Sequence, residues 1–401
     1  MPSFFFLVAE TIILRECIRN LIFLYQISAG RKGITGYAVS SNERDKQEAV
    51  MKTIIQKVNP EFFEDEELKE GCGILQSGGL VAFPTETVYG LGGDALSPEA
   101  AHKIYAAKGR PSDNPLIVHV ADMDGVCDVA KNISQEAYAL AKAFWPGPLT
   151  MVFEKQEKVP FSTTGGLETV AVRMPAHPVA AALIRCSGIY IAAPSANISG
   201  RPSPTKAEHV IKDLNGRIDM ILDGGQVGIG IESTILDMTD KIPVILRPGY
   251  ITKEMLEEVI GEVKVDPAVT IEEPDRNIVA KAPGMKYRHY APKGRLTIVE
   301  GSSEKVVRRI NALVHEKEEE HKKVAVIATE ESKADYRCRE VYSIGSRKTE
   351  GSIAAGLYDI LRKMDDIGAE YIFAESFAED RMGQAIMNRM LKAAGYHRIR
   401  A

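Results

Sequence analysis

The sequence predicts an α/β protein in which a larger domain with a twisted open sheet precedes a smaller, Rossmann-like domain. Three observations lead to this prediction. The chain of 401 residues has room for two domains and a linker, and its 45% hydrophobic residues suffice for ordinary cores. Short apolar runs typical of buried strands alternate with helical patterns. Several of these runs end in proline, glycine and small polar residues, at the place where open α/β sheets bind ligands.

The first informative element is the segment 79–93. Residues 80–83 predict a buried strand, Pro84 ends its ladder, and residues 85–93 predict a polar turn rich in glycine. Such a turn is also ordinary between a strand and a helix. The same pattern recurs, however, at residues 189–200, 220–225 and 244–249. Several strand ends carrying hydroxyl, amide and guanidinium groups therefore predict one convergent site.

The next element is a helix that ends at Lys108. Ser97 suits its N-cap, Pro98 its first position and Gly109 its C-terminal cap. A lysine in the last turn can simply be favoured by the helix dipole.

The loop after this helix helps to decide whether Lys108 is a helix-end residue or part of a binding site. Arg110 can be a solvated charge, but together with Lys108, Ser112 and Asn114 in a proline-bounded loop it favours an anion site. Lysine supplies a point charge there, and arginine supplies a fork for phosphate oxygens.

Two later strands place a polar side chain on one face. Residues 114–120 alternate so that His119 shares a face with Ile117, and residues 169–174 put Arg173 on the face of Thr169. A lone histidine on a strand is usually structural, and an arginine there can be an exposed edge residue. A guanidinium fork nevertheless fits the two oxygens of a carboxylate.

The last hundred residues predict the smaller domain. Residues 296–300, 324–329 and 371–375 read as buried strands, and residues 303–319 and 353–367 as helices between them. The first of these strands is not followed by GxGxxG, so we do not expect a dinucleotide site.

Five motifs give the larger domain a resemblance to a known family. They are PTETVYGLG at 84–92, KGRP at 108–111, NPLIVHV at 114–120, PSANISG at 194–200 and ESTI at 232–235. In this order they closely resemble the YrdC/Sua5 family of L-threonylcarbamoyladenylate synthases. The resemblance runs from about residue 71 to 249, and a weaker likeness to the Sua5 C-terminal domain covers about 295–401. It implies a YrdC-like catalytic domain followed by a Sua5 C-terminal domain.

The resemblance also implies roles for individual residues. The threonine pocket would be formed by Thr85, His119, Arg173 and Ser233. The ATP site would be formed by Lys108, Arg110, Ser112, Thr169, Ser195, Asn197, Ser203 and Arg247. No residue is assigned as acid or base, and Asp223 is read either as the end of a strand or as a catalytic carboxylate.

The implied reaction joins L-threonine, bicarbonate or CO2, and ATP into threonylcarbamoyl-AMP and pyrophosphate, which makes the enzyme a nucleotidyltransferase. The product would serve the tRNA threonylcarbamoyl transferase machinery that modifies adenosine 37, and the resemblance leaves room for a direct contact with tRNA. Mg²⁺ would arrive on the ATP phosphates, and no protein ligands are assigned to it. We expect a cytoplasmic protein without a membrane partner.

We expect four segments along the chain. Residues 1–50 are an N-terminal extension, with Met51 as the expected natural start, and residues 51–264 are the catalytic domain. Residues 265–293 form a linker, and 294–401 the C-terminal domain. The linker is either a solvated tether or a lid over the active site. The lid would use Met285, Tyr287 and His289.

The five cysteines are scattered without a CxxC pair, which predicts isolated reduced thiols. The apolar run within residues 4–27 is interrupted by charges and is too short to span a bilayer, which takes about 20 apolar residues.

Two other functions remain as alternatives. A clamp for double-stranded RNA or tRNA would use Lys108, Arg110, Arg173 and Arg247 as phosphate contacts, although a net charge of −5 argues against a chain that coats nucleic acid. A carbamoyltransferase-type domain, as in hydrogenase maturation proteins, would bring acylphosphatase and zinc-finger-like regions that this sequence lacks.

Overall fold

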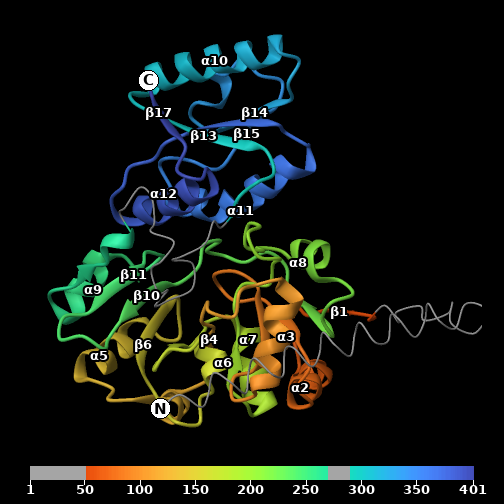
Figure 1. Cartoon of the computed structure of the whole chain (residues 1–401), viewed down its shortest axis with the longest axis vertical. Helices are drawn as coiled ribbons and strands as arrows, with labels where there is room; N and C mark the ends of the chain where they lie inside the picture. Colours follow the sequence, from red (N-terminus) through yellow and green to blue (C-terminus); the bar gives the residue numbers. More distant parts are fainter. Residues whose placement is uncertain (1–50, 270–289) are drawn as a thin grey trace, which may run out of the picture. The chain divides into compact units, whose positions relative to one another are not determined.

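The computed structural model describes residues 51–269 and 290–401, drawn in colour in Figure 1. Residues 51–401 form one compact unit. Within the described residues the chain builds two separate sheets, a larger mixed one and a smaller parallel one, each with helices packed against it. The predicted α/β class, with a large open sheet followed by a Rossmann-like unit, is confirmed.

The larger sheet contains both parallel and antiparallel pairs. Its strands are β1 (Ile54–Lys57), β2 (Val81–Phe83), β3 (Gly90–Asp94), β4 (Ile117–His119), β5 (Ala130–Lys131), β6 (Leu149–Lys155), β7 (Thr169–Arg173), β8 (Ile191–Ala192), β9 (Met220–Asp223), β10 (Thr234–Asp237), β11 (Val244–Arg247) and β12 (Lys264–Val265). They run in the order β1-β9-β2-β3-β8-β4-β7-β6-β10-β11-β12, with β5 paired to β6. The parallel pair of β4 and β7 lies near the middle and sets His119 beside Arg173.

The helices associated with this sheet are short. They are η1 (Asp65–Leu68), α2 (Lys69–Gln76), α3 (Pro98–Lys108), α4 (Met123–Val129), α5 (Gln135–Phe144), α6 (Phe161–Thr164), α7 (Pro178–Ser187), α8 (Ala207–Leu214), α9 (Lys253–Ile260) and η2 (Pro267–Val269). The predicted caps of α3 are confirmed, because the Ser97 side chain accepts from the Ala100 amide and Gly109 is left-handed with φ 59°.

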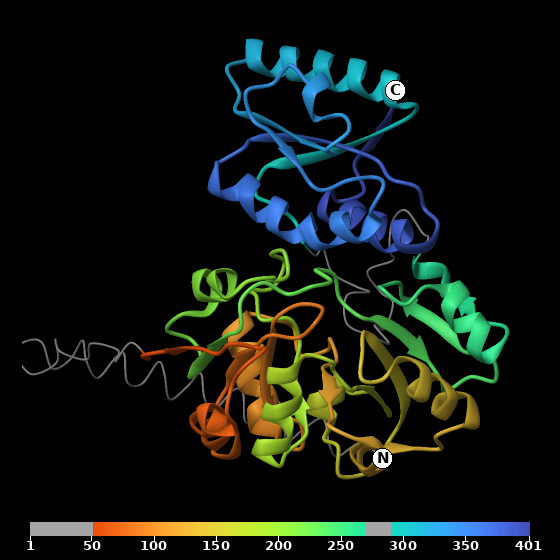
Figure 2. The same cartoon turned by 180° about the vertical axis from the view of Figure 1, so that it is seen from behind.

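The smaller sheet is parallel throughout. Its strands are β13 (Arg295–Glu300), β14 (Val324–Ala328), β15 (Val341–Ser343), β16 (Tyr371–Glu375) and β17 (Arg398–Arg400), in the order β15-β14-β16-β13-β17. Between them lie α10 (Ser303–Glu319), η3 (Lys333–Asp335), α11 (Glu350–Asp366) and α12 (Arg381–Ala393). Helix α10 covers one face, and α11 and α12 cover the other, as Figures 1 and 2 show from opposite sides. Both faces are thus buried, as parallel sheets require.

Helices α11 and α12 also contact the domain of the larger sheet. Tyr358 and Arg362 of α11 and Arg389 of α12 hydrogen-bond to carboxylates of that domain. Asp359 of α11 also pairs with Lys206.

Part of the predicted turn is in fact a strand. Residues 85–89 do bend, but Gly90–Asp94 forms β3, antiparallel to β2. Glycine is needed here for close packing rather than for turning. A Cβ at Gly92 would lie 2.7 Å from Ile191 Cγ2 and 2.8 Å from the Phe83 ring.

The prediction that all cysteines are isolated thiols is wrong for two of them. Cys72 of α2 and Cys186 of α7 form a disulfide, with their Cα atoms 6.0 Å apart. These helices pack against each other in the fold although the cysteines are 114 positions apart in sequence, so spacing gave no hint of the pairing. Cys127 and Cys338 are free thiols.

Some of the sequence-based predictions concern residues that the structure does not describe. Residues 1–50, with Cys17, and the lid residues Met285, Tyr287 and His289 lie outside the described residues. The division of the chain into these four segments stays a prediction. Among the described helices, none is both long and apolar enough to cross a membrane.

We predict that Gly356→Ala destabilises the protein by about 1 to 3 kcal/mol, because a Cβ there would lie 2.2 Å from the Ile344 carbonyl oxygen, a contact that α11 cannot avoid without moving. Gly351→Ala in the same helix is the matched control, since no atom lies within 4 Å of its Cβ position. It should be neutral or stabilising by up to about 1 kcal/mol. Urea unfolding measures both, and equal effects would contradict the packing argument.

Candidate active site

A polar cavity lies where β4 and β7 end and encloses about 700 Å³, including its open mouth. It collects side chains from several strand ends, as the recurring motifs predicted. The predicted site residues that line it are Thr85, Lys108, Arg110, His119, Arg173, Ser195, Asn197, Ser203, Ser233 and Arg247. The sequence motifs therefore converge in space.

Two predicted residues do not line this cavity. Ser112 is exposed in the turn after α3. Thr169 lies at the far end of β7 from Arg173, about 13 Å away at the usual strand rise. The alternation of residues along the strand correctly placed Thr169 on the same face as Arg173. It could not show that Thr169 lies at the end of β7 that is away from the cavity. Asp223 accepts a hydrogen bond from the Gly225 amide at 3.0 Å, which fits its reading as the end of β9.

Lys108 is buried at the end of α3, with 1% of its surface exposed. Its Nζ donates to the carbonyl oxygens of Ser195 and Asn197, the latter at 2.5 Å. Burial, and after it the nearby charge of Arg110, holds the pKa of Lys108 well below its usual value. A solvated helix-end lysine would show none of these features, so Lys108 belongs to the cavity.

Arg110 follows in the same wall. It donates to the carbonyl oxygens of Asn114 at 3.4 Å and Pro115 at 3.1 Å. Burial lowers the pKa of Arg110 to about 10, so the guanidinium is still charged at neutral pH. Arg110 and Lys108 together make this side of the cavity cationic.

His119 faces the cavity from β4 and is 3% exposed. Its Nδ1 lies 3.1 Å from the Ile117 carbonyl oxygen, and its ring packs edge-on to Phe83. Burial, helped by the charge of Arg173, lowers the pKa of His119 to about 3. The imidazole is therefore neutral at physiological pH and can offer one donor and one acceptor.

Arg173 forms an ion pair with Glu86, and the sequence analysis did not predict this pair. Its Nη2 lies 2.8 Å from Glu86 Oε1, its Nη1 donates to Thr87 Oγ1 at 2.9 Å, and its Nε donates to the Gly147 carbonyl. Burial by itself would raise the pKa of Glu86, but the charge and hydrogen bonding of Arg173 lower it overall. Glu86 and Thr87 stand in the PTETVYGLG motif, so the signal was present in the sequence.

The far wall is formed by Ser233 and Arg247. Ser233 Oγ lies 2.7 Å from Thr150 Oγ1, and Arg247 donates twice to the Ser233 carbonyl oxygen, at 3.0 and 3.1 Å. Arg247, the last residue of β11, thereby holds Ser233 in place just before β10 begins, and it adds another cation to the cavity.

Glu232 and Tyr290 also line the cavity and were not predicted. Glu232 accepts from Ser203 at 2.6 Å, from Tyr358 at 2.7 Å and from Arg389 at 3.2 Å. Burial alone would raise the pKa of Glu232, but Arg389 and other partners lower it to about 2, so it stays ionised. The C-terminal helices thus reach the cavity wall. Glu232 opens the ESTI motif, but its partners lie too far along the chain for the sequence to reveal them.

The arrangement suits anionic ligands with polar groups. Four basic residues, Lys108, Arg110, Arg173 and Arg247, surround a space lined by hydroxyls, an amide and a neutral imidazole. In residues 51–269 and 290–401 no three His, Cys, Asp or Glu side chains gather in a way that could hold a metal ion.

We predict that His119→Gln flattens the fall in stability between about pH 6.5 and about pH 3. In this window the unfolded chain takes up a proton on His119 that the folded chain, with its pKa of about 3, does not, so acid lowers the free energy of unfolding by up to about 1.4 kcal/mol per pH unit. Urea unfolding across the window measures the slope. The exposed His102→Gln is the control, and an unchanged slope in His119→Gln would contradict the burial of a neutral ring.

Comparison with known proteins agrees with this geometry. Residues 73–249 match the Sua5/YciO/YrdC family, described as telomere recombination, and residues 251–395 match the family described as threonylcarbamoyl-AMP synthase, C-terminal domain. The second match begins before the predicted linker.

Two relatives and one solved structure extend the comparison. Threonylcarbamoyl-AMP synthase of Pyrococcus abyssi is 51% identical over 87% of this chain and 99% of its own length. The enzyme of the same name from Bacillus subtilis is 51% identical over 84% of this chain and 95% of its own length. The crystal structure of P. abyssi Sua5 complexed with L-threonine, 50% identical, covers 87% of this chain and 100% of its own, with a TM-score of 0.83. The chain therefore belongs to the long, Sua5-type family of threonylcarbamoyl-AMP synthases and is an enzyme.

Proposed function

We propose that this enzyme is a nucleotidyltransferase that makes L-threonylcarbamoyladenylate and pyrophosphate from L-threonine, ATP and bicarbonate or CO2, in the cytoplasm. One observation carries the proposal. A single cavity joins a cationic side, with Lys108 and Arg110, to a side where Arg173 and neutral His119 end adjacent strands. Two substrates with different anionic groups can meet there.

The threonine side would consist of Thr85, His119, Arg173 and Ser233. Arg173 is the group suited to the substrate carboxylate, and its pairing with Glu86 keeps the buried fork oriented before threonine arrives. The neutral imidazole of His119 can hydrogen-bond to an uncharged polar group without attracting a second anion. The crystallised P. abyssi relative holds L-threonine, which supports this choice of substrate.

The ATP side would consist of Lys108, Arg110, Ser195, Asn197, Ser203 and Arg247. The three cations can stabilise the triphosphate and the charge that develops during transfer. Ser112 and Thr169, which do not line the cavity, are not part of this proposal. Magnesium would be bound by ATP phosphates and water.

The chemistry would need little from the protein besides binding and orientation. The neutral threonine amine adds to CO2 and releases a proton, or condenses with bicarbonate and releases water, and either route gives a carbamate. A carbamate oxygen then forms a bond to the α-phosphorus of ATP, and the bond to the bridging oxygen of pyrophosphate breaks. Holding both reactants in one cavity supplies the proximity that such a step requires. The product would pass to the tRNA threonylcarbamoyl transferase machinery.

The wild-type enzyme with ATP, Mg²⁺ and bicarbonate should release pyrophosphate only when threonine is added, and mass spectrometry should detect threonylcarbamoyl-AMP. Lys108→Met should lower turnover by about two orders of magnitude with the fold intact, because it removes a buried cation beside the phosphates. The exposed Lys103→Met is the control. An RNA clamp would bind tRNA without releasing pyrophosphate. That result for the wild-type protein would refute the proposal.

Arg173→Lys keeps the charge but loses the fork, so the threonine Kd should rise by about 30-fold, equivalent to roughly 2 kcal/mol, with the ATP affinity little changed. Calorimetric titration measures both affinities. Glu86→Gln is the companion variant: its amide oxygen can still accept a hydrogen bond from Arg173 and keep the fork oriented, so threonine binding should stay largely intact. Unchanged threonine affinity in Arg173→Lys would remove Arg173 from the substrate pocket.

A further inference from the structure

The loop 195–203 forms much of the ATP side of the cavity and contains no helix and no extended strand. Apart from an isolated bridge between Ser195 and Gly90, contacts made by side chains and by single backbone groups set its position. We call residues 195–203 the ATP-side loop. Whatever fixes this loop also fixes the phosphate-binding side of the proposed site.

The inner end of the ATP-side loop is tied to Lys108. The ammonium binds the carbonyl oxygens of Ser195 and Asn197. The Asn197 side chain in turn donates to the carbonyl oxygens of Ile198 and Arg201, both at 2.9 Å. The position of the Lys108 ammonium is therefore linked through Asn197 to Arg201.

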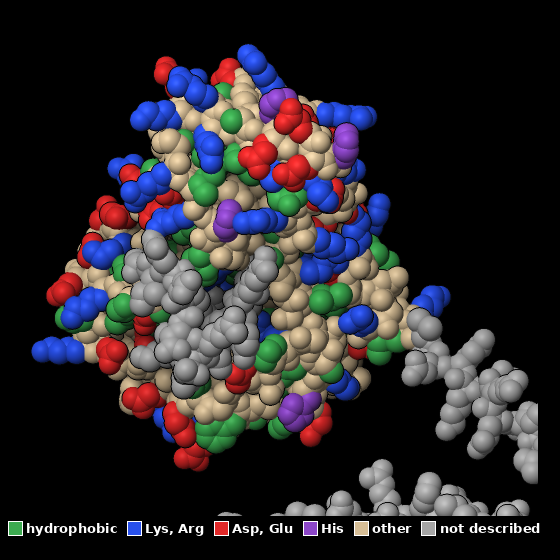
Figure 3. Space-filling model, turned by 45° about the horizontal axis from the view of Figure 1, so that its top comes forward, with side chains coloured by type: hydrophobic (Ala, Val, Ile, Leu, Met, Phe, Trp, Pro, Cys, Tyr) green, Lys and Arg blue, Asp and Glu red, His purple; other side chains and the backbone are tan. Residues whose placement is uncertain are grey.

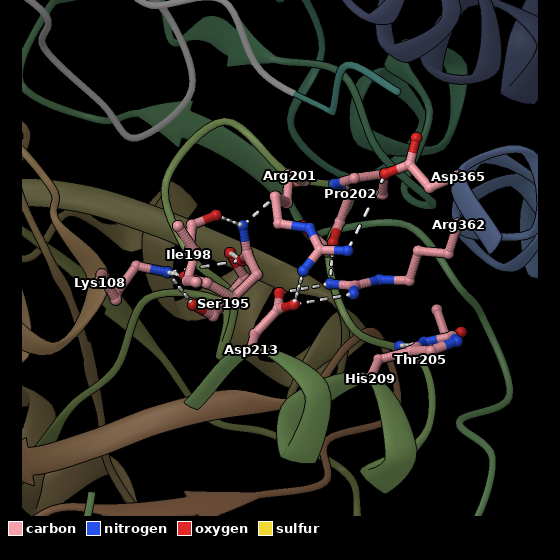
Figure 4. Close-up of polar contacts among 12 residues, drawn as sticks. Lys108, Ser195, Ile198, Arg201, Pro202, Thr205, His209, Asp213, Arg362 and Asp365 are labelled. Atoms are coloured by element: carbon pink, nitrogen blue, oxygen red, sulfur yellow. Dashed lines mark hydrogen bonds and ion pairs between the residues drawn. The ribbon is translucent and has the colours of Figure 1, made fainter. Parts of the chain in front are cut away.

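The outer end of the ATP-side loop is tied to the C-terminal domain. Arg201 donates to Asp213 of α8 at 2.5 Å, and Arg362 of α11 binds the same carboxylate with both of its terminal nitrogens, at 2.9 and 3.3 Å. Arg362 Nη2 also donates to the Pro202 carbonyl oxygen. Figure 4 shows the two guanidinium groups converging on Asp213, with Ser195 and Lys108 to the left of them and Arg362 reaching in from the right.

Burial makes this contact different from an ordinary surface ion pair. Asp213 is 4% exposed and Arg362 is 3% exposed, whereas Arg201 is only part-buried. A buried guanidinium that binds a helix carboxylate and a loop carbonyl together fixes both in one geometry. Without it, Asp213 would depend on Arg201 alone, and the Pro202 carbonyl would lose its buried donor.

We propose that Arg362 is a positioning residue for ATP: from α11 it holds Asp213 and the ATP-side loop so that Lys108, Ser195 and Ser203 meet the nucleotide in the right place. This inference rests on the proposed function. It gives the C-terminal domain a defined part in a reaction whose contacting groups belong to the other domain. Two of the four threonine-side residues, His119 and Arg173, are positioned by the backbone ladder of β4 and β7, so we expect threonine binding to depend little on Arg362.

The experiment measures binding by calorimetry, with threonine and with an ATP analogue that carries a methylene between its α and β phosphates. Arg362→Met should weaken the analogue at least about tenfold, since a displacement of about 1 Å can cost 100-fold, and should change threonine affinity less than about twofold. Arg362→Lys, which retains the charge, covers the case in which the Met variant fails to fold. It should give an intermediate loss.

The chain offers a matched control across the same two helices. Lys212 next to Asp213 pairs with Asp366 of α11 at 2.9 Å, but both side chains are about half exposed and neither binds the ATP-side loop. Lys212→Met should leave both affinities unchanged. Asp213→Asn combined with Arg362→Met should weaken the analogue by less than the two single losses added together, because the two residues share one contact.

Two outcomes would overturn the proposal. One is unchanged analogue affinity in a folded Arg362 variant. The other is an equal loss of analogue and threonine affinity, which would indicate general destabilisation. Because these measurements need no turnover, they stand apart from the test of function: a wild-type enzyme without threonine-dependent pyrophosphate release would refute the proposed reaction whatever the Arg362 variants show.

Discussion

Positive charge buried in the cavity wall is the constraint on which the rest of this structure depends. Lys108 is buried and Arg110 is part-buried, and both donate to backbone carbonyl oxygens, which stabilise a cation without cancelling its charge. The loops that carry those carbonyls must therefore stay in place. The ATP-side loop, the turn after α3 and the C-terminal helices can all be understood as the means of holding them there.

Two arginines at the domain contact are also buried cations, but their partners are carboxylates instead of backbone carbonyl groups. Arg362 and Arg389 reach from α11 and α12 to Asp213 and Glu232, two buried carboxylates of the other domain. Removing one partner of such a buried pair costs about 3 to 5 kcal/mol, because the other charge is left unpaired. Each of these buried charges would destabilise the fold if it had no partner. The arginines of one domain pair with the carboxylates of the other, so each domain supplies the partner. Figure 3 shows that acidic and basic side chains are interspersed on the exposed face as well.

Local signals in the sequence predicted many of the elements, and the five motifs of the resemblance picked out most of the predicted residues that line the cavity. The caps of α3 follow from Ser97 and Gly109, and the alternation in β4 and β7 brings His119 and Arg173 to one place. What failed depends on contacts between distant residues. Alternation could not tell that Thr169 lies at the wrong end of β7, because it fixes the face of a strand and not its position along it.

The pairings that sequence reasoning missed have the same origin. Arg173 and Glu86 are 87 positions apart, Glu232 and Arg389 are 157 apart, and the two disulfide cysteines are 114 apart. No local pattern encodes such separations. Glycines were also misread at β3, where the absence of a side chain serves close packing against Phe83 and Ile191 rather than a turn.

The sharing of Glu232 has a consequence for how this protein loses its structure. One oxygen of this carboxylate accepts from Ser203 of its own domain, and the other accepts from Tyr358 and Arg389 across the domain contact. Separating the domains would strand an ionised carboxylate on one side and a fully buried guanidinium on the other. Near the melting temperature a partly opened state would therefore be little populated, and the two domains should melt in a single cooperative step.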